Sequence, residues 1–364
     1  MKHSLTSLSE LHQSENERAF FFSHREVIQE NLYQWKSGVK NLQVAYSLKA
    51  NYDDKTLNFF GSNCDFLEVA SLDEFELASH HVSTRFILVN GPIYTVHDLR
   101  IICSTGAILI IESLTQLKII NELQKDNLFC FRLGVRIRVT GFPSSRFGIS
   151  EEELKEFKEL LNTKSKLELL HCHYCEGFRS VKNFGQRIVS LNNIRKKYFP
   201  KVNHLNIGGG YYSEMPVSLS QQFKEVIPSI QEYVDHIQEY FPDNVQLTTE
   251  IGAGLVANAV DYICRVEDLK TIDNQIFIVT NGSKWDIKPN GSAKNLPFQV
   301  YSAKVARRPQ QIVKVVGYTC MEDDIMFNGK AETPSVGDFL VFKNCGAYAQ
   351  SLSPDFIINR KNSI

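Results

Sequence analysis

The chain has 364 residues, of which 43% are hydrophobic and 22% are charged, so it is long enough to bury a large core. Its 40 basic and 41 acidic residues give a net charge of -1, which argues against the basic footprint of a nucleic-acid-binding protein. The polar start lacks the apolar core of a signal peptide, and no apolar run approaches the ~18 residues that span a membrane. We therefore expect a cytoplasmic protein without nucleic-acid or membrane partners.

The order of apolar and polar segments predicts an α/β fold. After a short mixed segment, residues 1–25, the chain repeats a short apolar strand, a polar or glycine-bearing end and an amphipathic stretch. The predicted strands are Leu42–Ser47, Asp65–Val69, Phe86–Val89, Ala107–Ile111, Leu128–Val135, Leu167–His173, Val202–Ile207 and Val245–Glu250. Eight such units over ~210 residues are typical of a (β/α)8 TIM-type barrel, whose functional groups gather at the carboxyl ends of the strands.

Helix-start signals support this reading. Ser71 and Ser150 are each followed three residues later by a glutamate, which predicts capping boxes, and Thr95 is placed to cap a helix beginning at Val96.

After Ala259 the sequence pattern changes: β-branched and aromatic runs follow one another without amphipathic helical segments between them. These runs are Ile276–Val279, Gln299–Ala303, Ile312–Val316 and Phe339–Phe342. They predict an all-β C-terminal domain of the sandwich or barrel type. We expect a barrel over residues 26–265, a β-domain over residues 266–364, and an N-terminal segment, residues 1–25, that joins the β-domain.

The polar residues at the predicted strand ends form a chemically coherent set. They are Lys49, His171, His173, Gly208, Gly209, Gly210, Glu250, Gly252 and Gly254. A lysine nucleophile, a histidine that stacks on a ring, glycines that approach a phosphate and a carboxylate for a pyridine nitrogen together describe a pyridoxal phosphate site. Each residue alone has a structural alternative, since strand-end lysines are often simply solvated and glycine runs often form plain turns.

Eight short motifs occur in the order that a known family shows. They are YSLKAN (46–51), LEVAS (67–71), SRFGI (145–149), HCH (171–173), IGGG (207–210), EIGAG (250–254), CMEDD (320–324) and GDFLVFKNCGAY (337–348). With these motifs the chain resembles the fold-type III pyridoxal-phosphate decarboxylases, which include ornithine, diaminopimelate and carboxynorspermidine decarboxylases. The resemblance implies a barrel followed by a β-domain, pyridoxal phosphate as cofactor, and a homodimer whose active sites are shared between subunits.

The resemblance also implies residue roles. Lys49 would bind the cofactor, His173 would stack on its ring, and Glu250 would face the pyridine nitrogen. Cys320 would donate a proton in the site of the partner subunit. Phosphate contacts would fall on Gly209, Gly210, Gly252 and Tyr348. Across the dimer, Arg146 would pair with Asp324.

Departures from the family pattern bear on the substrate. The motif after HCH reads Tyr174-Cys175-Glu176, which looks more like the carboxynorspermidine branch than an x-Gly-Ser pattern. Met321 stands where an acid would meet the far amine, and Ala253 stands where an arginine would face the phosphate. We therefore expect decarboxylation at the amino-carboxyl end of a diamino acid or an aminocarboxypropyl-type substrate other than ornithine or diaminopimelate. Glu176 and Asp324 are the candidate substrate contacts; Lys284 and Lys288 are either carboxylate-binding or solvated.

Competing interpretations stay open at this point. Cys172 and Cys175 spell C-x-x-C, but the chain has no second such pair, and a strand would place the two thiols on opposite faces, so we expect no metal. A pyridoxal-phosphate racemase is an alternative, although Glu250 favours the deeper electron sink that loss of CO2 requires. A non-catalytic decarboxylase-like binding protein is a third, although the chain retains both Lys49 and Cys320.

Overall fold

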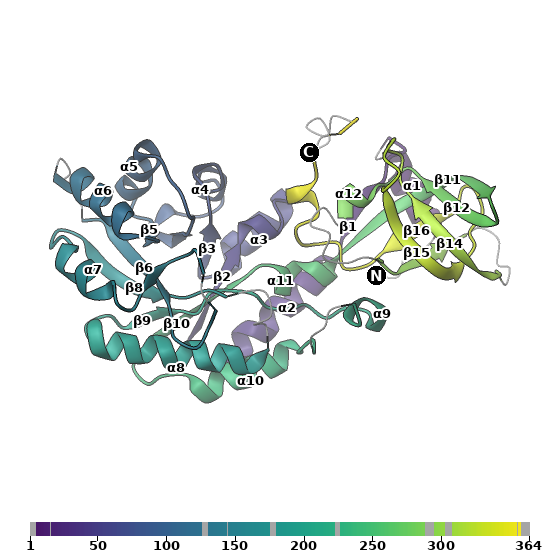
Figure 1. Cartoon of the computed structure of the whole chain (residues 1–364). Helices are drawn as coiled ribbons and strands as arrows, with labels where there is room; N and C mark the ends of the chain where they lie inside the picture. The colour runs from purple at the N-terminus through teal and green to yellow at the C-terminus, as the bar shows by residue number, and fades with distance from the viewer. Residues whose placement is uncertain are drawn as a thin grey trace. The chain divides into compact units, whose positions relative to one another are not determined.

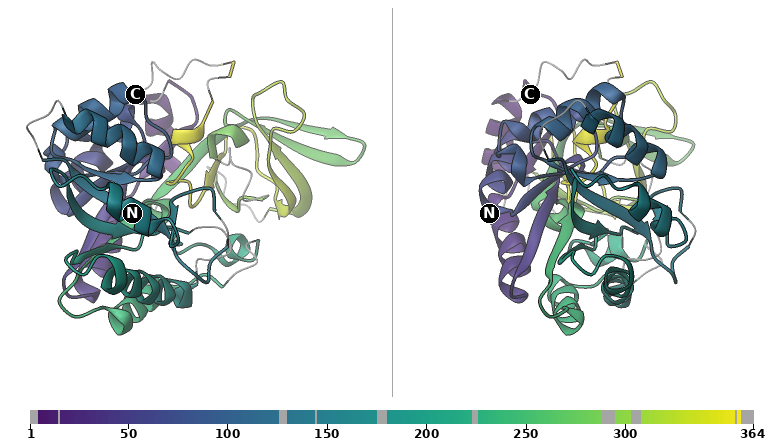
Figure 2. Two further views of the ribbon diagram at one scale, coloured as in Figure 1. Left: turned by 60° about the vertical axis from the view of Figure 1, so that its left-hand side comes forward. Right: turned by 90° about the vertical axis from the view of Figure 1, so that its left-hand side faces the viewer.

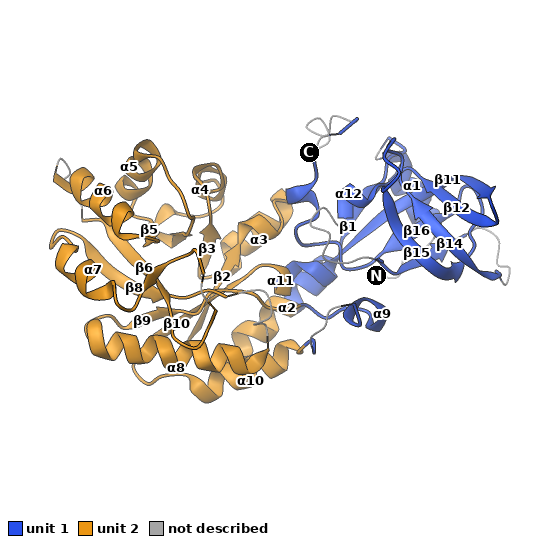
Figure 3. Cartoon of the chain, viewed as in Figure 1, with its two compact units in different colours: residues 1–30, 213–227, 255–364 blue, residues 31–212, 228–254 orange. Residues whose placement is uncertain are grey.

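The computed structural model describes residues 5–14, 16–125, 130–143, 145–174, 180–222, 226–287, 295–302, 308–354 and 356–357. The chain forms two compact units (Figure 3). Unit 2 comprises Asn31–Tyr212 and Pro228–Gly254, and unit 1 comprises Met1–Glu30, Ser213–Ile227 and Leu255–Ile364. Within the described ranges, none of the helices has the length and apolar character needed to cross a membrane.

Unit 2 is a closed barrel of parallel strands. Its strands are β2 (Leu42–Ser47), β3 (Phe66–Val69), β4 (Ile87–Val89), β5 (Ile108–Ile111), β6 (Arg132–Arg138), β8 (Lys166–His171), β9 (His204–Asn206) and β10 (Gln246–Ile251). They pair in the order β5-β4-β3-β2-β10-β9-β8-β6, and a β5–β6 pairing closes the ring. The short β7 (Ile149–Ser150) pairs with β6 outside this ring. The predicted (β/α)8 barrel is therefore confirmed.

Helices alternate with these strands and lie outside the ring (Figure 2). They are α2 (Arg25–Gly38), α3 (Asp54–Asn63), α4 (Leu72–Ser79), α5 (Val96–Ser104), α6 (Leu114–Lys125), α7 (Leu154–Leu160), α8 (Val181–Tyr198) and α10 (Ile230–Tyr240), with short 3₁₀ turns η1 (Leu48–Ala50) and η2 (Thr84–Phe86). Ser71 and Thr95 cap α4 and α5 as predicted, but the capping box predicted at Ser71 is incomplete because the Glu74 carboxylate accepts from the Ala70 N–H. The reciprocal bonds predicted for Ser150 and Glu153 also form, but α7 begins only at Leu154 because residues 151–153 make a turn first.

The inside of the barrel is filled by apolar side chains from successive strands. They include Ala45, Phe66, Leu88, Ile108, Ile110 and Leu169. Parallel strands are covered on both faces, which is why they read as continuous apolar runs in the sequence. Gly134 belongs to this core because a Cβ there would lie 2.7 Å from Cδ1 of Leu169. The packed core leaves the strand ends as the place for polar chemistry.

Unit 1 is built on a mostly antiparallel sheet (Figure 1). Its strands run in the order β13 (Phe298–Tyr301), β16 (Phe339–Phe342), β11 (Val260–Ile272), β12 (Gln275–Thr280), β14 (Gln310–Val316) and β15 (Ile325–Glu332), and only β12 and β14 pair in parallel. β1 (Phe20–Ser23) pairs with β11. The unit also holds α1 (Leu5–Ser14), α9 (Val217–Ser220), α12 (Lys284–Ile287), η3 (Ala257–Ala259) and η4 (Gln350–Leu352), and α11 (Ala253–Val256) begins at the end of unit 2.

The four predicted strands of the all-β region correspond to β12, β13, β14 and β16 of unit 1, and Ala303, the predicted end of one of them, lies outside the described residues. The expected boundary at residue 265 falls inside β11, and Ser213–Ile227 also belongs to this unit. β11 and β15 had no prediction because their outward halves are polar and solvent-exposed, which masks the apolar alternation.

Candidate active site

Lys49 lies in η1, immediately after β2, and its ammonium group meets a buried carboxylate. Its Nζ lies 2.7 Å from Oε1 and 2.5 Å from Oε2 of Glu68, which stands at the end of the neighbouring β3. The Lys49 side chain is 35% exposed, whereas the Glu68 side chain is fully buried. The lysine is thus held in a fixed direction but stays accessible at the strand ends.

Glu68 is a carboxyl group whose proton affinity the fold has changed. Burial raises its pKa, the Lys49 ammonium opposes that rise, and the charge of Glu250 adds to it. A carboxylate of this kind is suited to exchange a proton with the amine that it touches. Glu68 belongs to the motif LEVAS (67–71), but the sequence did not predict that Glu68 pairs with Lys49.

Glu250, on β10, is held by two side chains from neighbouring strands. Asn206 Nδ2 donates to its Oε1 at 2.8 Å, and His171 Nε2 lies 3.3 Å from its carboxylate oxygens. The residue is 1% exposed. Burial alone would raise the pKa of Glu250, but its interactions with the imidazoles of His171 and His173 hold it well below the usual range. Glu250 is therefore an anion whose carboxylate is held in a fixed position by Asn206 and His171.

His173 follows β8 and is the partly exposed histidine of the HCH motif. Its Nδ1 accepts a hydrogen bond from the Gly209 N–H at 3.0 Å, which leaves a proton of the neutral ring on Nε2. Burial lowers the pKa of His173, so the neutral ring is the favoured form near neutrality. Its ring packs at 6.4 Å between centroids against the fully buried His171, with an interplanar angle of 26°. The two rings therefore lie side by side at the end of β8.

The triple glycine after β9 forms a turn that only small residues fit. Gly208 and Gly210 have φ of +66° and +104°, which favours glycine, and a Cβ on Gly209 would lie 2.2 Å from the Glu250 carbonyl oxygen. Gly252 lies just after β10 and is half-buried. The structure therefore brings Lys49, His173, Gly209, Gly210, Glu250 and Gly252 to the carboxyl ends of the barrel strands.

A second ion pair at the strand ends was missed by the sequence analysis. Arg136 Nη1 donates to Glu112 Oε1 at 2.7 Å, and the Gly148 N–H donates to Glu112 Oε2 at 2.8 Å. The guanidinium also lies 4.7 Å from the centroid of the Phe147 ring and 3.4 Å from the His173 carbonyl oxygen. Glu112 therefore fixes both Arg136 and the SRFGI loop. Only the position of Glu112, directly after a predicted strand, could have indicated it.

Three of the other predicted residues, Cys320, Asp324 and Tyr348, lie in unit 1. Cys320 is exposed and Tyr348 adopts a φ of +58°. Asp324 is 2% exposed, and its carboxylate accepts hydrogen bonds from Ser283 Oγ, the Lys284 N–H and Thr319 Oγ1. Asp324 therefore joins two loops of unit 1. Its proposed contact with the substrate and its proposed ion pair with the exposed Arg146 stay predictions. Glu176 and Lys288 lie outside the described residues.

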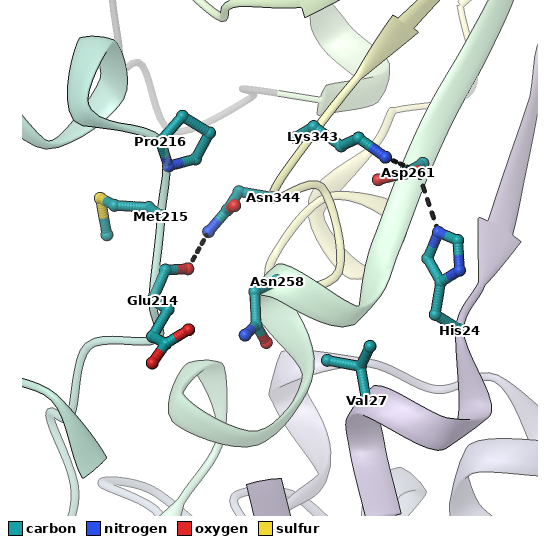
Figure 4. A pocket seen from close by; sticks show the side chains of 9 residues that line it. All are labelled: His24, Val27, Glu214, Met215, Pro216, Asn258, Asp261, Lys343 and Asn344. Atoms are coloured by element: carbon teal, nitrogen blue, oxygen red, sulfur yellow. Dashed lines mark hydrogen bonds and ion pairs between the residues drawn. The ribbon is translucent and has the colours of Figure 1, made fainter. Parts of the chain in front are cut away.

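Unit 1 also contains a pocket of about 430 Å³ (Figure 4). It is lined by His24, Val27, Glu214, Met215, Pro216, Asn258, Asp261, Lys343 and Asn344, none of which the sequence analysis selected. Asp261 is buried and accepts from His24 Nε2 at 2.9 Å and from the Lys343 ammonium. These charges are paired with one another, so we assign the pocket no catalytic role.

Two kinds of ligand, a metal ion and pyridoxal phosphate, could bind among the polar residues of the barrel. His171, His173 and Glu250 present ligand atoms within 4.8 Å of one another, as a metal site would. However, the single lone pair of His173 Nδ1, the ring atom nearest Glu250, already accepts from the Gly209 N–H and is therefore not available to a metal. Pyridoxal phosphate fits better, because it uses the accessible lysine, the buried anion, the histidine ring and the glycine turn together.

Comparisons with known proteins agree with this fit. Residues 25–257 match the family model for the pyridoxal-dependent decarboxylase, pyridoxal binding domain. The 2-[(L-alanin-3-ylcarbamoyl)methyl]-2-hydroxybutanedioate decarboxylase of Staphylococcus aureus is 27% identical, over 86% of this chain and 84% of that protein. The L-glutamyl-[BtrI acyl-carrier protein] decarboxylase of Niallia circulans is 25% identical, over 93% of this chain and 86% of that protein.

Solved structures show the same fold. The arginine decarboxylase of Paramecium bursaria Chlorella virus superposes with a TM-score of 0.82 at 19% identity, covering 96% of each chain. The diaminopimelate decarboxylase of Helicobacter pylori, complexed with L-lysine, gives a TM-score of 0.82 at 19% identity, covering 98% of this chain and 91% of that one. Because the matched region runs from the start of α2 to the beginning of η3, this chain belongs to the pyridoxal-dependent decarboxylases and removes CO2 from an amino acid with pyridoxal phosphate as its cofactor.

Proposed function

We propose that this chain decarboxylates the amino-acid end of a longer molecule, with Lys49 as the residue that carries the cofactor. The observation that supports this most is the joint placement of the Lys49–Glu68 pair and the Glu250 anion at the ends of adjoining barrel strands. Pyridoxal phosphate supplies an electron sink for the electron pair that CO2 leaves behind on Cα.

The residues of the barrel have separate tasks in this proposal. Glu68 takes a proton from the Lys49 Nζ and returns it, because it touches that atom and is buried. Glu250 holds a proton at the pyridine nitrogen, and His171 and Asn206 keep its carboxylate in place. The partly exposed face of His173 stacks against the ring, and Gly209, Gly210, Gly252 and Tyr348 serve the phosphate.

The Cys320 thiol is the proposed proton donor at Cα after CO2 has left. We propose that it acts in the site of the partner subunit of a homodimer, and that the enzyme works in the cytoplasm. The exposure of Cys320 in unit 1 supports the first proposal, since a thiol that serves another subunit must be accessible. Without that donor the proton would go to the wrong atom, so Cys320 decides the product rather than the loss of CO2.

The substrate is proposed to carry its amino-acid group on a longer arm that does not end in a free amine. Met321 follows Cys320, is 38% exposed and offers no charge to an amine. The names of the two relatives support the same substrate class, since one names an L-alanin-3-yl group joined through an amide and the other an L-glutamyl group joined to a carrier protein. Ornithine and diaminopimelate, whose far ends carry free amines, are therefore poor candidates.

The test is CO2 release from a panel of amino acids. The panel contains ornithine, diaminopimelate, a carboxyaminopropyl amine and 2,3-diaminopropionate amides of dicarboxylic acids, each with the parent enzyme and with Lys49→Ala. We expect release from an amide and none from Lys49→Ala, whereas the carboxyaminopropyl amine, which ends in a free amine, should be a poor substrate. Turnover of ornithine or diaminopimelate as the best substrate would refute the proposed substrate class. Release of CO2 by Lys49→Ala would refute the role of the lysine.

A further inference from the structure

A fully buried arginine lies beneath the glycine turn that follows β9. Arg187, on α8, is 0% exposed. Its Nη1 donates to the carbonyl oxygen of Gly209 at 2.8 Å and to that of Ile207 at 3.3 Å, and its Nη2 donates to the carbonyl oxygen of Tyr174 at 2.5 Å. One guanidinium therefore ties the segment after β8 to the turn after β9.

Burying a guanidinium is costly unless its surroundings compensate for the lost water. Here backbone carbonyls accept its protons, and the ring of Phe184 lies 4.1 Å from its Cζ. The same ring stacks on Tyr211, whose hydroxyl bonds to Thr249 Oγ1 at 2.5 Å. Arg187 is thus part of a rigid layer under the turn, and a cation kept at this cost requires a reason beyond packing.

The carbonyl and N–H groups of the turn have different partners. The Gly208 carbonyl accepts from the Glu250 N–H and from Thr249 Oγ1, and the Ile207 and Gly209 carbonyls accept from Arg187. Each carbonyl from Ile207 to Gly209 therefore has a hydrogen-bond donor within the protein. The Gly208 and Gly209 N–H groups donate to Asn206 and His173. By contrast, the N–H groups of Gly210 and Tyr211 have no acceptor in the part of the chain that the structure describes.

These facts meet in one peptide group, the one between Gly209 and Gly210. Its oxygen accepts from the Arg187 cation, while its N–H has no protein acceptor. A hydrogen bond from a charged donor to the oxygen of an amide polarises that amide and makes its N–H a stronger donor. The N–H of Gly210 is accordingly prepared for an anion, and the positive charge behind it favours the same ligand.

We propose that Arg187 is a positioning residue for the cofactor phosphate, acting through the Gly209–Gly210 peptide without contacting the phosphate itself. This inference rests on the assignment of pyridoxal phosphate to the barrel and of Lys49 as the residue that binds its aldehyde. It explains why a charged side chain is kept in the layer between α8 and the barrel. It also makes a prediction that separates the phosphate from the rest of the cofactor.

The experiment compares pyridoxal phosphate with pyridoxal, which lacks the phosphate. Both aldehydes are titrated into the apo-forms of the parent, Arg187→Met and Arg187→Lys, and the visible band of the lysine-bound cofactor is followed. We expect Arg187→Met to bind pyridoxal phosphate at least about tenfold more weakly, the scale of a lost charge-assisted hydrogen bond, and pyridoxal almost as well as the parent does. Arg187→Lys keeps the positive charge but loses the two-pronged guanidinium, so its affinity for pyridoxal phosphate should lie between those of the parent and Arg187→Met.

Leu191→Ala is the matched control, because Leu191 is a fully buried residue of the same helix. It should lower the unfolding temperature and leave the preference for pyridoxal phosphate over pyridoxal unchanged. An unchanged preference in Arg187→Met, or an equal loss for both aldehydes, would show that Arg187 only stabilises the fold. If Arg187→Met does not fold, the preference of Arg187→Lys decides in the same way. A parent protein that binds neither aldehyde would contradict the cofactor assignment instead.

Discussion

The protonation state of Glu250 depends on residues that are distant from it in the sequence. Its position at the end of a strand could be predicted from the sequence, because a segment rich in β-branched residues ends there and glycines follow. Its state could not be predicted, because that depends on Asn206 and His171, which reach it from other strands. The same holds for Lys49, whose partner Glu68 comes from the next strand of the ring. Strand ends can be read in a sequence, whereas contacts across a closed ring cannot.

His204 makes the stability of the barrel depend on pH. It is buried on β9 with its Nε2 2.7 Å from Thr248 Oγ1, and burial lowers its pKa from 6.5 to about 4. The unfolded chain binds a proton below about pH 6.5 while the folded chain does not, so stability is complete above pH 6.5 and falls as the pH drops toward 4. Between about pH 7.5 and pH 5 this one residue should cost about 2 kcal/mol of unfolding free energy.

Urea unfolding of the parent and of His204→Gln at both pH values measures that cost. The variant should lose less stability on acidification than the parent by about 2 kcal/mol. The exposed His97, changed to glutamine in the same way, is the control and should leave the pH dependence as it is. An equal loss of unfolding free energy on acidification in His204→Gln and in the parent would show that His204 is protonated in the folded chain.

The elements differ in how far the sequence determines them. β2 has the predicted bounds because most of its residues are apolar and all but Gln43 are buried, as in a strand of a parallel barrel. β6 instead extends to Arg138, beyond the predicted Val135, because its arginines pair with acids of other elements and so remain in the strand. The capping residues of α4 and α5 were predicted correctly, since those contacts are local. Sequence patterns therefore predict local and apolar features better than paired charges.

The Glu112–Arg136 pair links β5, β6 and the SRFGI loop, and its removal should be costly. Both side chains are nearly buried, with exposures of 6% and 11%. Glu112→Ala leaves Arg136 without its carboxylate, so we expect a loss of roughly 3–5 kcal/mol in the free energy of unfolding. The double variant Glu112→Ala/Arg136→Met should recover part of that loss, because it removes the unpaired charge as well.

Urea unfolding curves of the three proteins measure this pair. Glu122→Ala is the control, since Glu122 pairs with Lys125 on the surface and its removal should leave the midpoint unchanged. A single variant Glu112→Ala as stable as the parent would contradict the importance of the pair.

At the scale of the whole molecule, the sequence predicted a barrel followed by a β-domain, and both are present. It did not predict that Ser213–Ile227 leaves unit 2 and that the chain returns to it at Pro228. The reason is physical: this segment lacks the apolar periodicity of a core element, and its unit is decided by contacts distant in sequence. The assembly of subunits is likewise a property that one chain does not display.

Mixing two variants that form no amine tests the proposed homodimer. Lys49→Ala lacks the cofactor lysine, and Cys320→Ala should release CO2 but deliver the proton to the cofactor, which gives a carbonyl compound and pyridoxamine phosphate instead of amine. If each site uses Lys49 of one subunit and Cys320 of the other, random exchange makes half of the dimers mixed, each with one intact site. Amine formation should then return to about a quarter of the parent rate. A mixture no more active than its components would mean that the sites are not shared.

The most direct test of the account is to locate the cofactor on the chain. The holoenzyme is treated with borohydride, which fixes the bond between pyridoxal phosphate and its lysine, then digested and analysed by mass spectrometry. We predict that the pyridoxyl group is found on Lys49, within the peptide that contains YSLKAN, and that Lys49→Ala carries none. A pyridoxyl group on another lysine, with Lys49 unmodified, would contradict the assignment of the active site to the ends of β2, β3 and β10.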